Sequence, residues 1–420
     1  MSLAFHACPP PGEWLNDPNG LIHADGAWRL FTQHRADAPA FRATGWARLS
    51  SANGLDWAWD GPVIATTPGE WAYSGSVGAG PDGLTAVHTV HHAATGLESQ
   101  VIRTSTDAGL SWSDGRMVIE AARDVRDPFV CGDGTMLLAR PCGWDIPDAA
   151  SQIGIWREGD AGWGEVARIG PWHPPGVMWE VPVVLRTGAR DLLLISTVDR
   201  RDGAADCTVF GWAGVLGPTG FDCDPDWPTG GRRIDLGPDF YAAMAASDGR
   251  VVAWLSSWAT ARDMPWPGFA GGPISLLRRL SLDGSRVRHE VDPGVVAAFV
   301  RRVDAVPVAG CATATIDGHA AFTLSLQGAA TATVAGDPAA GTLAVRRSAG
   351  APLAWAAVHD DVLAPCATRR LTLFVDGPAV ELFVEPDGCA VSLALPDGGR
   401  AFEVQLTVDG ASAALDWTVR

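Results

Sequence analysis

The stretch Ser51-Ala52-Asn53-Gly54-Leu55-Asp56-Trp57 has a counterpart about 54 residues later, in Ser105-Thr106-Asp107-Ala108-Gly109-Leu110-Ser111-Trp112. In each copy an Asn or Asp side chain can close a turn on its own backbone, and a Gly supplies a positive φ. A Trp then opens the next strand. The separation suits one four-stranded propeller blade, which takes roughly 40–50 residues in common repeats. The repeat therefore predicts a β-propeller, with chance similarity of two β-turns as the alternative.

The remaining secondary-structure signals are also those of strands. Short apolar or alternating runs are separated by Gly, Pro, Asp and Asn, which is typical of strands joined by turns. Examples are residues 28–33, 101–104, 136–139, 192–198 and 251–254. No long stretch has the periodicity of an amphipathic helix. We therefore predict an all-β protein.

The tryptophans divide the chain into two parts. All of them except Trp355 and Trp417 precede Gly268, and the later part is rich in Ala, Val, Thr and Leu. A chain of 420 residues is also longer than one core usually serves. We predict a propeller over residues 1–287, a linker over 288–302 and a β-sandwich over 303–420. Within the linker, residues 295–300 are expected to form a short helical or extended connector.

The composition excludes several classes of function. The net charge of −17 argues against nucleic acid and anionic membranes as partners. No apolar run approaches the roughly 20 residues that span a bilayer. Residues 1–12 lack the basic start and apolar core of a signal peptide. We therefore expect a globular, cytoplasmic protein with a small-molecule partner.

Lysine is absent from the sequence, so every basic side chain in the charge count is an arginine. This excludes Schiff-base and pyridoxal-phosphate lysine chemistry and a P-loop lysine. No cysteine pair has C-x-x-C or zinc-ligand spacing, so we expect no zinc site and reduced core thiols. The carboxylate chemistry predicted below requires no metal and no cofactor. The cysteines are Cys8, Cys131, Cys142, Cys207, Cys223, Cys311, Cys366 and Cys389.

Three short segments each carry an isolated carboxylate in an unusual setting. Asp17 lies in Trp14-Leu15-Asn16-Asp17-Pro18-Asn19-Gly20, between an apolar entry and a tight-turn signal. Asp127 lies in Arg126-Asp127-Pro128, at the opening of a strand. Glu180 lies in Trp179-Glu180-Val181-Pro182. Two carboxylates can hydrolyse a glycosidic bond, one as nucleophile and one as acid/base, and a third can stabilise the charge on the sugar.

The surroundings of Glu180 are strongly apolar. A Glu in such a setting either has a partner or has a raised pKa. A raised pKa is what a general acid needs near neutral pH. The alternative is a buried Glu that is bridged to an arginine for structural reasons.

These three motifs, in this order, resemble glycoside hydrolase family 32, the invertase, inulinase and levanase group. The resemblance runs through most of the chain. Further segments similar to family motifs are Phe31-Thr32-Gln33, Gly45-Trp46-Ala47, Tyr73-Ser74-Gly75-Ser76, Asp239-Phe240-Tyr241-Ala242, residues 276–280, Phe374-Val375-Asp376 and Val380-Glu381-Leu382-Phe383.

The resemblance implies a five-bladed β-propeller, whose three carboxylates face a central funnel, followed by a C-terminal β-sandwich. It makes Asp17 the nucleophile, Glu180 the acid/base and Asp127 a transition-state stabiliser. It implies a fructosyl site formed by Asn16, Gln33, Trp46, Ser74, Arg126 and Tyr241. Trp71 and Trp266 are expected to border the leaving group, with core packing as the alternative.

The chain departs from the family pattern in three places. Val181 stands where the family usually has a Cys after the acid/base, which bears on how Glu180 is tuned. Thr32 replaces a usual aromatic residue, and the usual His near Trp46 is missing. The last two changes are expected to reshape the pocket beyond the fructosyl ring, so the preferred substrate does not carry over from the family.

The predicted activity is that of a retaining, exo-acting β-fructofuranosidase, which acts on sucrose or short fructo-oligosaccharides of the inulin or levan type. One alternative is a fructosyltransferase of the same family, because a sugar can replace water in the second step. Another is an inverting propeller glycosidase acting on arabinan or xylan, whose carboxyl groups would be wider apart. A third is a sugar-binding protein without catalysis. The sequence leaves the oligomeric state open.

Overall fold

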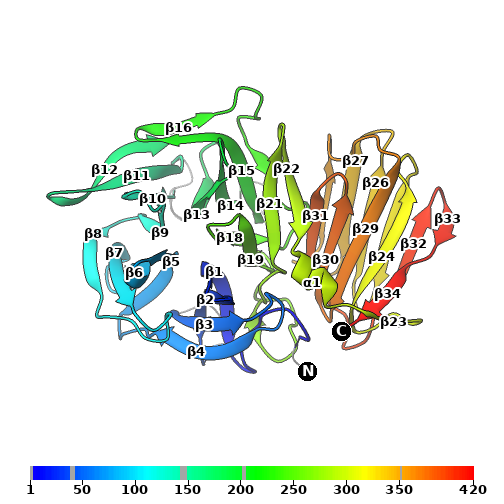
Figure 1. Cartoon of the computed structure of the whole chain (residues 1–420), viewed down its shortest axis with the longest axis horizontal. Coiled ribbons are helices and arrows are strands. Elements are labelled where there is room, and N and C mark those ends of the chain that lie inside the picture. Colours follow the sequence, from blue (N-terminus) through cyan, green and yellow to red (C-terminus); the bar gives the residue numbers. More distant parts are fainter. Residues whose placement is uncertain (1–2, 38–42, 142–148, 201–204, 351) are drawn as a thin grey trace.

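The computed structural model describes residues 3–37, 43–141, 149–200, 205–350 and 352–420, and these are almost entirely strands and turns (Figure 1). The all-β prediction is therefore confirmed. The helix in this part of the chain is α1 (Pro293–Ala297), which lies within the predicted linker and overlaps the expected connector at residues 295–297. Asp292 caps it by accepting from the Gly294 N–H, and Pro293 suits the first helical position.

The first 291 residues form five sheets, each an antiparallel meander that starts at its innermost strand. The first sheet contains β1 (Trp14–Ala24), β2 (Ala27–Arg35), β3 (Gly45–Ser51), β4 (Ala58–Ile64) and β20 (Ala270–Gly271). The second contains β5 (Glu70–Gly80), β6 (Gly83–His92), β7 (Leu97–Ser105) and β8 (Arg116–Ala122). The third contains β9 (Arg126–Val130), β10 (Thr135–Arg140), β11 (Gln152–Gly159) and β12 (Gly162–Ile169). The fourth contains β13 (Val177–Arg186), β14 (Asp191–Asp199), β15 (Asp206–Gly217), β16 (Gly220–Cys223) and β17 (Arg232–Arg233). The fifth contains β18 (Tyr241–Ala245), β19 (Arg250–Trp254), β21 (Arg278–Asp283) and β22 (Arg286–Val291).

The innermost strands β1, β5, β9, β13 and β18 contact one another in that cyclic order, and β18 returns to β1. The short strand β20 also pairs in parallel with β1, which joins the end of the series to its beginning. We call β1 to β22 the five-sheet ring, and Figure 1 shows its sheets arranged around a common centre. The centre is therefore walled by the first strand of every sheet.

The two repeated turns occupy equivalent places, between the third and fourth strands of the first two sheets. The Asn53 side chain accepts from the N–H groups of Leu55 and Asp56, and the Asp107 side chain accepts from that of Ser111. The prediction of Asx-closed turns is confirmed. The prediction that a Trp opens each following strand is only half right, since β4 starts directly after Trp57 but β8 starts at Arg116.

The last part of the chain forms two six-stranded sheets, which we call the C-terminal sheet pair. One contains β23 (Arg301–Val303), β34 (Asp416–Val419), β24 (Ala309–Asp317), β29 (Thr368–Asp376), β30 (Ala379–Glu385) and β31 (Cys389–Ala394). The other contains β28 (Trp355–His359), β27 (Thr342–Ser348), β26 (Thr331–Asp337), β25 (Phe322–Gln327), β32 (Glu403–Val408) and β33 (Ala411–Ala413). Burial alternates along β25, β26 and β27, and residues of both sheets share one apolar cluster. The two sheets therefore pack face to face.

The N-terminal segment connects the ring to the sheet pair. Asp376 of β29 accepts hydrogen bonds from the backbone N–H groups of Ala4, Phe5 and His6. The His6 ring lies 3.0 Å from Asp376 and 2.9 Å from Glu381, and all three side chains are buried. Burial alone lowers the pKa of His6, but hydrogen bonds and charge interactions with these two carboxylates raise it to about 9.

This histidine predicts a pH-dependent stability. The folded protein keeps the His6 proton to about pH 9, whereas an unfolded His releases it near 6.5. The stabilisation is thus fully present below pH 6.5 and is lost as the pH rises through 9. We expect the free energy of unfolding to fall by a few kcal/mol at most across this interval. Denaturant titrations at pH 6 and pH 9.5 measure the fall, and equal falls in wild type and His6→Gln would contradict the prediction.

No helix in the described ranges is long and apolar enough to cross a membrane. The cysteines that the structure describes are all unpaired: Cys8, Cys131, Cys207, Cys223, Cys311, Cys366 and Cys389. Cys142, which was included in the expectation of reduced thiols, lies outside the described residues. In the same ranges, no group of three or more His, Cys, Asp or Glu side chains is placed to hold a metal ion.

Candidate active site

Each innermost strand of the ring has an irregular register at the position of a predicted site residue. The shift lies between Leu15 and Pro18 in β1, between Ala72 and Gly75 in β5, and opposite 137–139 in β9. It lies between Glu180 and Val183 in β13, and between Tyr241 and Met244 in β18. Bulges redirect side chains and interrupt the alternation of a strand. Adjacent residues such as Asn16 and Asp17 can therefore face the same site.

Three of these bulges place a residue other than Gly in the left-handed region. The φ angles are 60° for Asp127, 47° for Val181 and 51° for Ala242. A β-branched residue is strongly disfavoured there, so Val181 holds a strained backbone. Its N–H donates to Asp127 Oδ2 over 3.1 Å. The strain thus supports a contact between two of the three carboxylate segments.

Asp17 is held by side chains from the first two sheets. Ser74 of β5 donates to Asp17 Oδ2 over 2.6 Å, and Asn16 donates to Asp17 Oδ1 over 3.1 Å. Gln33 of β2 joins these two residues, since it accepts from Asn16 and donates to Ser74 Oγ over 3.0 Å. Both oxygens of the Asp17 carboxylate therefore have a fixed direction.

Glu180 is held from two other sheets. Arg126 of β9 donates to Glu180 Oε1 over 3.0 Å, and the Tyr241 hydroxyl of β18 donates to Glu180 Oε2 over 2.7 Å. This Glu therefore has the partners that its apolar sequence context requires. Arg126 also lies 3.5 Å from Glu98 and 4.0 Å from Asp127, so several carboxylates share one guanidinium.

Asp127 is fixed through its backbone as well as its side chain. Its N–H donates to Thr89 Oγ1 over 2.9 Å, and that hydroxyl donates to Gln100 Oε1 over 2.8 Å. Gln100 in turn donates to the Val125 carbonyl over 2.6 Å. These buried amide and hydroxyl groups hold the segment before the bulge in place.

The three carboxylates influence one another electrostatically. Burial is the main cause that raises the pKa of Asp17 to about 6, and the charge of Glu180 adds to it. The hydrogen bonds from Ser74 and Asn16 act in the opposite direction. Burial and the charges of Glu180 and Asp17 raise the pKa of Asp127 well above its usual range, although Arg126 lowers it. Burial thus raises the pKa of both aspartates above the ordinary range of a carboxyl group.

The structure brings most predicted site residues together, but it gives several of them a different position from the one expected. Asp17, Asp127 and Arg126 retain 6–7% exposure, whereas the residues behind them retain 0–2%. The latter are Asn16, Gln33, Ser74 and Tyr241. Asn16, Ser74 and Tyr241 bond to the carboxylates directly, and Gln33 holds Asn16 and Ser74 in place.

The three predicted tryptophans lie in different surroundings. Trp46 is completely buried, and its Nε1–H donates to the Tyr73 carbonyl over 3.0 Å. Trp71 is half-buried beside the rings of Tyr73 and His91, 6.2 Å and 5.2 Å away. Trp266 instead packs in an apolar cluster that also contains residues of the C-terminal sheet pair, and stacks on Phe269. For Trp266 the core-packing alternative describes the structure, since its loop lies against that sheet pair.

Sequence reasoning missed Thr89, Gln100, Glu98 and the backbone N–H of Val181. None of them belongs to a motif, and they reach the site only through pairing of strands. Glu98 and Gln100 lie on β7, and Thr89 lies on β6, both one or two strands away from the centre. No pattern in the sequence could have indicated them.

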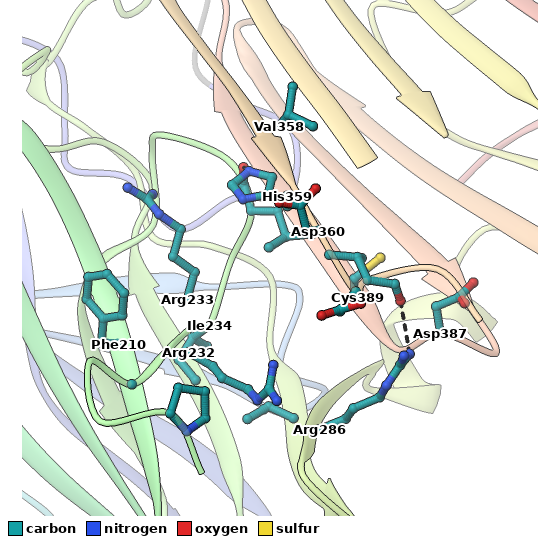
Figure 2. Close-up of a pocket in the computed structure, with 16 residues that line it drawn as sticks. Phe210, Arg232, Arg233, Ile234, Arg286, Val358, His359, Asp360, Asp387 and Cys389 are labelled. Atoms are coloured by element: carbon teal, nitrogen blue, oxygen red, sulfur yellow. Dashed lines mark hydrogen bonds between the residues drawn. The ribbon is translucent and has the colours of Figure 1, made fainter. Parts of the chain in front are cut away.

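A separate cleft of about 390 Å³ lies between the ring and the C-terminal sheet pair (Figure 2). Arg232, Arg233 and Ile234 line it from the ring, and His359 and Asp360 from the sheet pair. None of the three carboxylates borders this cleft. It is therefore distinct from the candidate active site.

Comparison with known proteins agrees with the arrangement of these motifs. Residues 6–290 match the model of the glycosyl hydrolases family 32 N-terminal domain. The chain belongs to glycosyl hydrolase family 32. The resemblance that the motifs predicted is thereby confirmed. The matched region of this family 32 protein contains the whole five-sheet ring apart from the last residue of β22.

One curated relative and two solved structures illustrate the similarity in sequence and in fold. A sucrose-6-phosphate hydrolase of Zymomonas mobilis is 27% identical over 316 residues, which are 67% of this chain and 60% of the relative. The exo-inulinase of Aspergillus awamori superposes with a TM-score of 0.79 at 19% identity, over 99% of this chain and 96% of that one. The sucrose-6-phosphate hydrolase of Lactobacillus gasseri gives a TM-score of 0.82 at 20% identity, over 100% and 93%. This family 32 protein thus shares the fold of these structures, and it spans about 60% of the length of the first curated relative.

Proposed function

We propose that the chain is a retaining, exo-acting β-fructofuranosidase, which releases terminal β-D-fructofuranosyl units from sucrose or short fructo-oligosaccharides. The observation that carries the proposal is the meeting of Asp17, Asp127 and Glu180 in one hydrogen-bonded site at the centre of the ring. Membership of family 32 supports the same reaction class. The names of the relatives, a sucrose-6-phosphate hydrolase and an exo-inulinase, support β-fructosides as substrates.

In this proposal the ring is a five-bladed β-propeller over residues 1–287. Residues 288–302 join it to a β-sandwich over 303–420, which is the C-terminal sheet pair. The cyclic contacts of the innermost strands support the propeller assignment, and the shared apolar cluster supports the sandwich. The last propeller strand, β22, extends to Val291 and thus into the linker.

The first chemical step would transfer the fructosyl unit to the protein. A carboxylate oxygen of Asp17 attacks C2 of the sugar while Glu180 protonates the departing glycosidic oxygen. The C2–O bond to the leaving group breaks as the bond to Asp17 forms, through an oxocarbenium-like transition state. The hydrogen bonds to both oxygens of Asp17 and of Glu180 keep the two carboxyl groups oriented for this step.

The second step would return the site to its first state. Glu180 removes a proton from water, the water oxygen bonds to C2, and the bond from C2 to Asp17 breaks. Fructose leaves and Glu180 carries the proton needed for the next cycle. Every atom comes from the substrate, water and these two side chains.

The pKa of Asp17 supports its assigned role. With a pKa of about 6, Asp17 is mostly ionised near neutral pH, as a nucleophile must be. Burial and the neighbouring carboxylates raise the pKa of Asp127, which favours its protonated form, and a protonated carboxyl can donate a hydrogen bond to a sugar hydroxyl. Fructosyl transfer and an inverting reaction remain the competing reactions to be tested.

Product analysis tests the proposed function. We expect fructose from sucrose, 1-kestose and levanbiose, with the β-anomer formed first in NMR spectra because two displacements retain configuration. Sucrose 6-phosphate, inulin and arabinan complete the panel and rank the substrates. Arabinose release, an α-anomer as first product, or binding of fructans without any product would overturn the proposal. New oligosaccharides at high sucrose would identify a transferase.

The Ser74 hydroxyl predicts a shift of the pH profile. It stabilises the ionised form of Asp17, so Ser74→Ala is expected to raise the pKa of Asp17 above about 6. The acidic limb of kcat/KM should move to higher pH by about one to two units, because a hydrogen bond to a charged group contributes roughly 1.5–3 kcal/mol. The matched control is Ser76→Ala on the same strand, whose hydroxyl accepts from the Val130 N–H. An unmoved acidic limb in Ser74→Ala would show that another group controls it.

We also propose a cytoplasmic location. The unpaired state of the described cysteines supports a reducing compartment. Fractionation of the source cells with an activity assay checks this, and activity confined to the medium would contradict it.

A further inference from the structure

The segment 234–239 connects the fourth sheet of the ring to the fifth and lies along the edge of the C-terminal sheet pair. Leu236 N–H donates to the Ala390 carbonyl over 2.9 Å, and Asp239 N–H donates to the Ser392 carbonyl over 3.4 Å. A Cβ on Gly237 would lie 2.1 Å from the Ser392 carbonyl oxygen, so only Gly allows this approach. Ile234 and Leu236 also line the cleft between the two parts (Figure 2). The segment thus extends the sheet beyond β31.

Two buried aspartates fix both ends of this segment to the sheet pair. Asp235 accepts from the N–H and the hydroxyl of Ser392, each over 2.8 Å, and from Arg278 over 2.8 Å. Asp239 accepts from the Ala394 N–H over 2.8 Å and from the Thr260 hydroxyl over 3.1 Å. Asp235 and Asp239 are 3% and 0% exposed, so their charges depend on these partners.

The cation that pairs with Asp239 comes from the opposite sheet of the pair. Arg347 lies on β27 and is 2% exposed. Its NH1 group contacts Asp239 Oδ2 and also donates to the Ala394 carbonyl over 2.7 Å, while its Nε–H donates to the Leu353 carbonyl. Arg347 therefore reaches from the sheet pair to the segment and neutralises Asp239.

The anchored segment leads directly to the candidate acid/base. Phe240 follows Asp239, and the Arg278 guanidinium lies 4.5 Å from the centre of its ring. Tyr241 comes next and donates to Glu180 Oε2 over 2.7 Å. Only one residue thus separates an aspartate bound to the C-terminal sheet pair from the tyrosine that orients Glu180. Tyr241 is the first residue of β18, and Ala242 lies in the bulge that follows it.

We infer that Arg347 and Asp239 are positioning residues for the acid/base, so that the C-terminal sheet pair takes part in proton transfer through Tyr241. This inference rests on the proposed function, in which Glu180 is the acid/base. Arg347 and Asp239 touch neither the substrate nor the reacting atoms. They hold the start of β18 in the position from which the Tyr241 hydroxyl donates to Glu180.

The inference predicts a defect that depends on the leaving group. Without Arg347, Asp239 is a buried charge without its cation, and the segment moves to reach water or another donor. Tyr241 then shifts, and Glu180 loses one of its two partners. Protonation of a poor leaving group suffers, whereas an aryl leaving group departs without a proton. Attack by Asp17 is unaffected, because its partners lie on β1, β2 and β5.

The experiment compares Arg347→Gln with wild type on sucrose and on an aryl β-D-fructofuranoside, at a temperature where circular dichroism shows both folded. We expect kcat to fall 10- to 100-fold on sucrose and less than 3-fold on the aryl substrate when azide is present, since azide attacks the fructosyl-enzyme without a general base. The alkaline limb of the sucrose pH profile should also shift. Arg347→Lys, which keeps the cation, should recover most of the loss.

The matched control is Arg369→Gln. Arg369 is also a buried arginine of the sheet pair, bonded to Asp387 and to the carbonyls of Gly318 and Ala364, but it does not touch the segment. The Arg369→Gln variant should be less stable than wild type, but the ratio of its kcat values on the two substrates should be unchanged. If Arg347→Gln fails to fold, the double variant Asp239→Asn, Arg347→Gln removes both charges and is expected to show the same substrate ratio as Tyr241→Phe.

The outcomes separate this inference from the function on which it rests. Suppose that Glu180→Gln shows the leaving-group dependence, whereas the Arg347 variants lower kcat equally on both substrates. The positioning role is then wrong and the proposed function stands. If Glu180→Gln itself shows no leaving-group dependence, the acid/base assignment fails first. The inference would also be overturned if Arg369→Gln changed the ratio of kcat on sucrose to kcat on the aryl substrate as much as Arg347→Gln does. The effect would then reflect a general destabilisation of the sheet pair.

Discussion

Replacement of Asp17 by Asn is expected to lower kcat for sucrose at least about 10⁴-fold, because the variant lacks the carboxylate that forms the covalent intermediate in the proposed mechanism. Asn has nearly the same shape, so its oxygen can still accept from Asn16, and its NH2 group can donate to the Ser74 hydroxyl in place of the bond that Ser74 donates to Asp17. The loss would therefore measure the nucleophile and not a rearranged site. Binding of sucrose, followed by calorimetry, should change much less than kcat.

The control for this variant is Asp25→Asn, at the turn between β1 and β2. Asp25 is exposed and has a φ of 52°, a conformation that Asn adopts about as readily as Asp. Its turnover should equal that of wild type. Residual sucrose hydrolysis by Asp17→Asn within 10-fold of wild type, in a preparation free of deamidated protein, would remove Asp17 from the mechanism.

Replacement of Glu180 by Gln is expected to lower kcat for sucrose by about 10²- to 10⁴-fold, the usual contribution of a general acid or base. Gln keeps contacts with Arg126 and Tyr241 but cannot donate or accept the catalytic proton. On an aryl fructoside the fructosyl-enzyme should still form and then accumulate, since no base activates water. Added azide should release it as fructosyl azide.

A matched control for this change is Glu165→Gln on the outer strand β12. Glu165 is also bonded to arginines, Arg140 at 2.8 Å and Arg168, but it lies far from the ring centre in its sheet. We expect wild-type kinetics on both substrates. If azide did not accelerate Glu180→Gln on the aryl substrate, another group would have to supply the proton, and the role of Glu180 would be wrong.

The partners of Glu180 could not be predicted from the sequence. An apolar context predicts either a partner or a raised pKa, and the sequence alone leaves both open. The partners are Arg126 and Tyr241, which are 54 and 61 residues away along the chain. Only the closure of the ring brings their strands beside β13.

Val181 follows the proposed acid/base, at a position where the family usually has a Cys. From the sequence, Val181 raised a question about how Glu180 is tuned. In the structure, Val181 bonds to the site through its backbone. Its backbone N–H holds Asp127 from a strained left-handed conformation at φ 47°. A Val181→Gly variant would relieve this strain, because Gly adopts a positive φ readily. No sequence pattern predicts a bulge at this residue.

The sequence by itself determined the all-β class, the Asx-closed turns at Asn53 and Asp107, and the carboxylates that meet at the centre. These features depend on local chemistry: alternation of apolar residues, turn formation by Asx and Gly, and motifs in which neighbouring residues act together. Such information is contained in a few consecutive residues and is readable without knowledge of the fold.

Only the tertiary structure decided which side chains stand behind each carboxylate and which part of the chain supports them. Ser74 reaches Asp17 and Arg347 reaches Asp239 across separations of 57 and 108 residues. Trp266, expected near the leaving group, packs at the C-terminal sheet pair for the same reason. Register shifts and sheet closure set these contacts, and both depend on the packing of the whole chain.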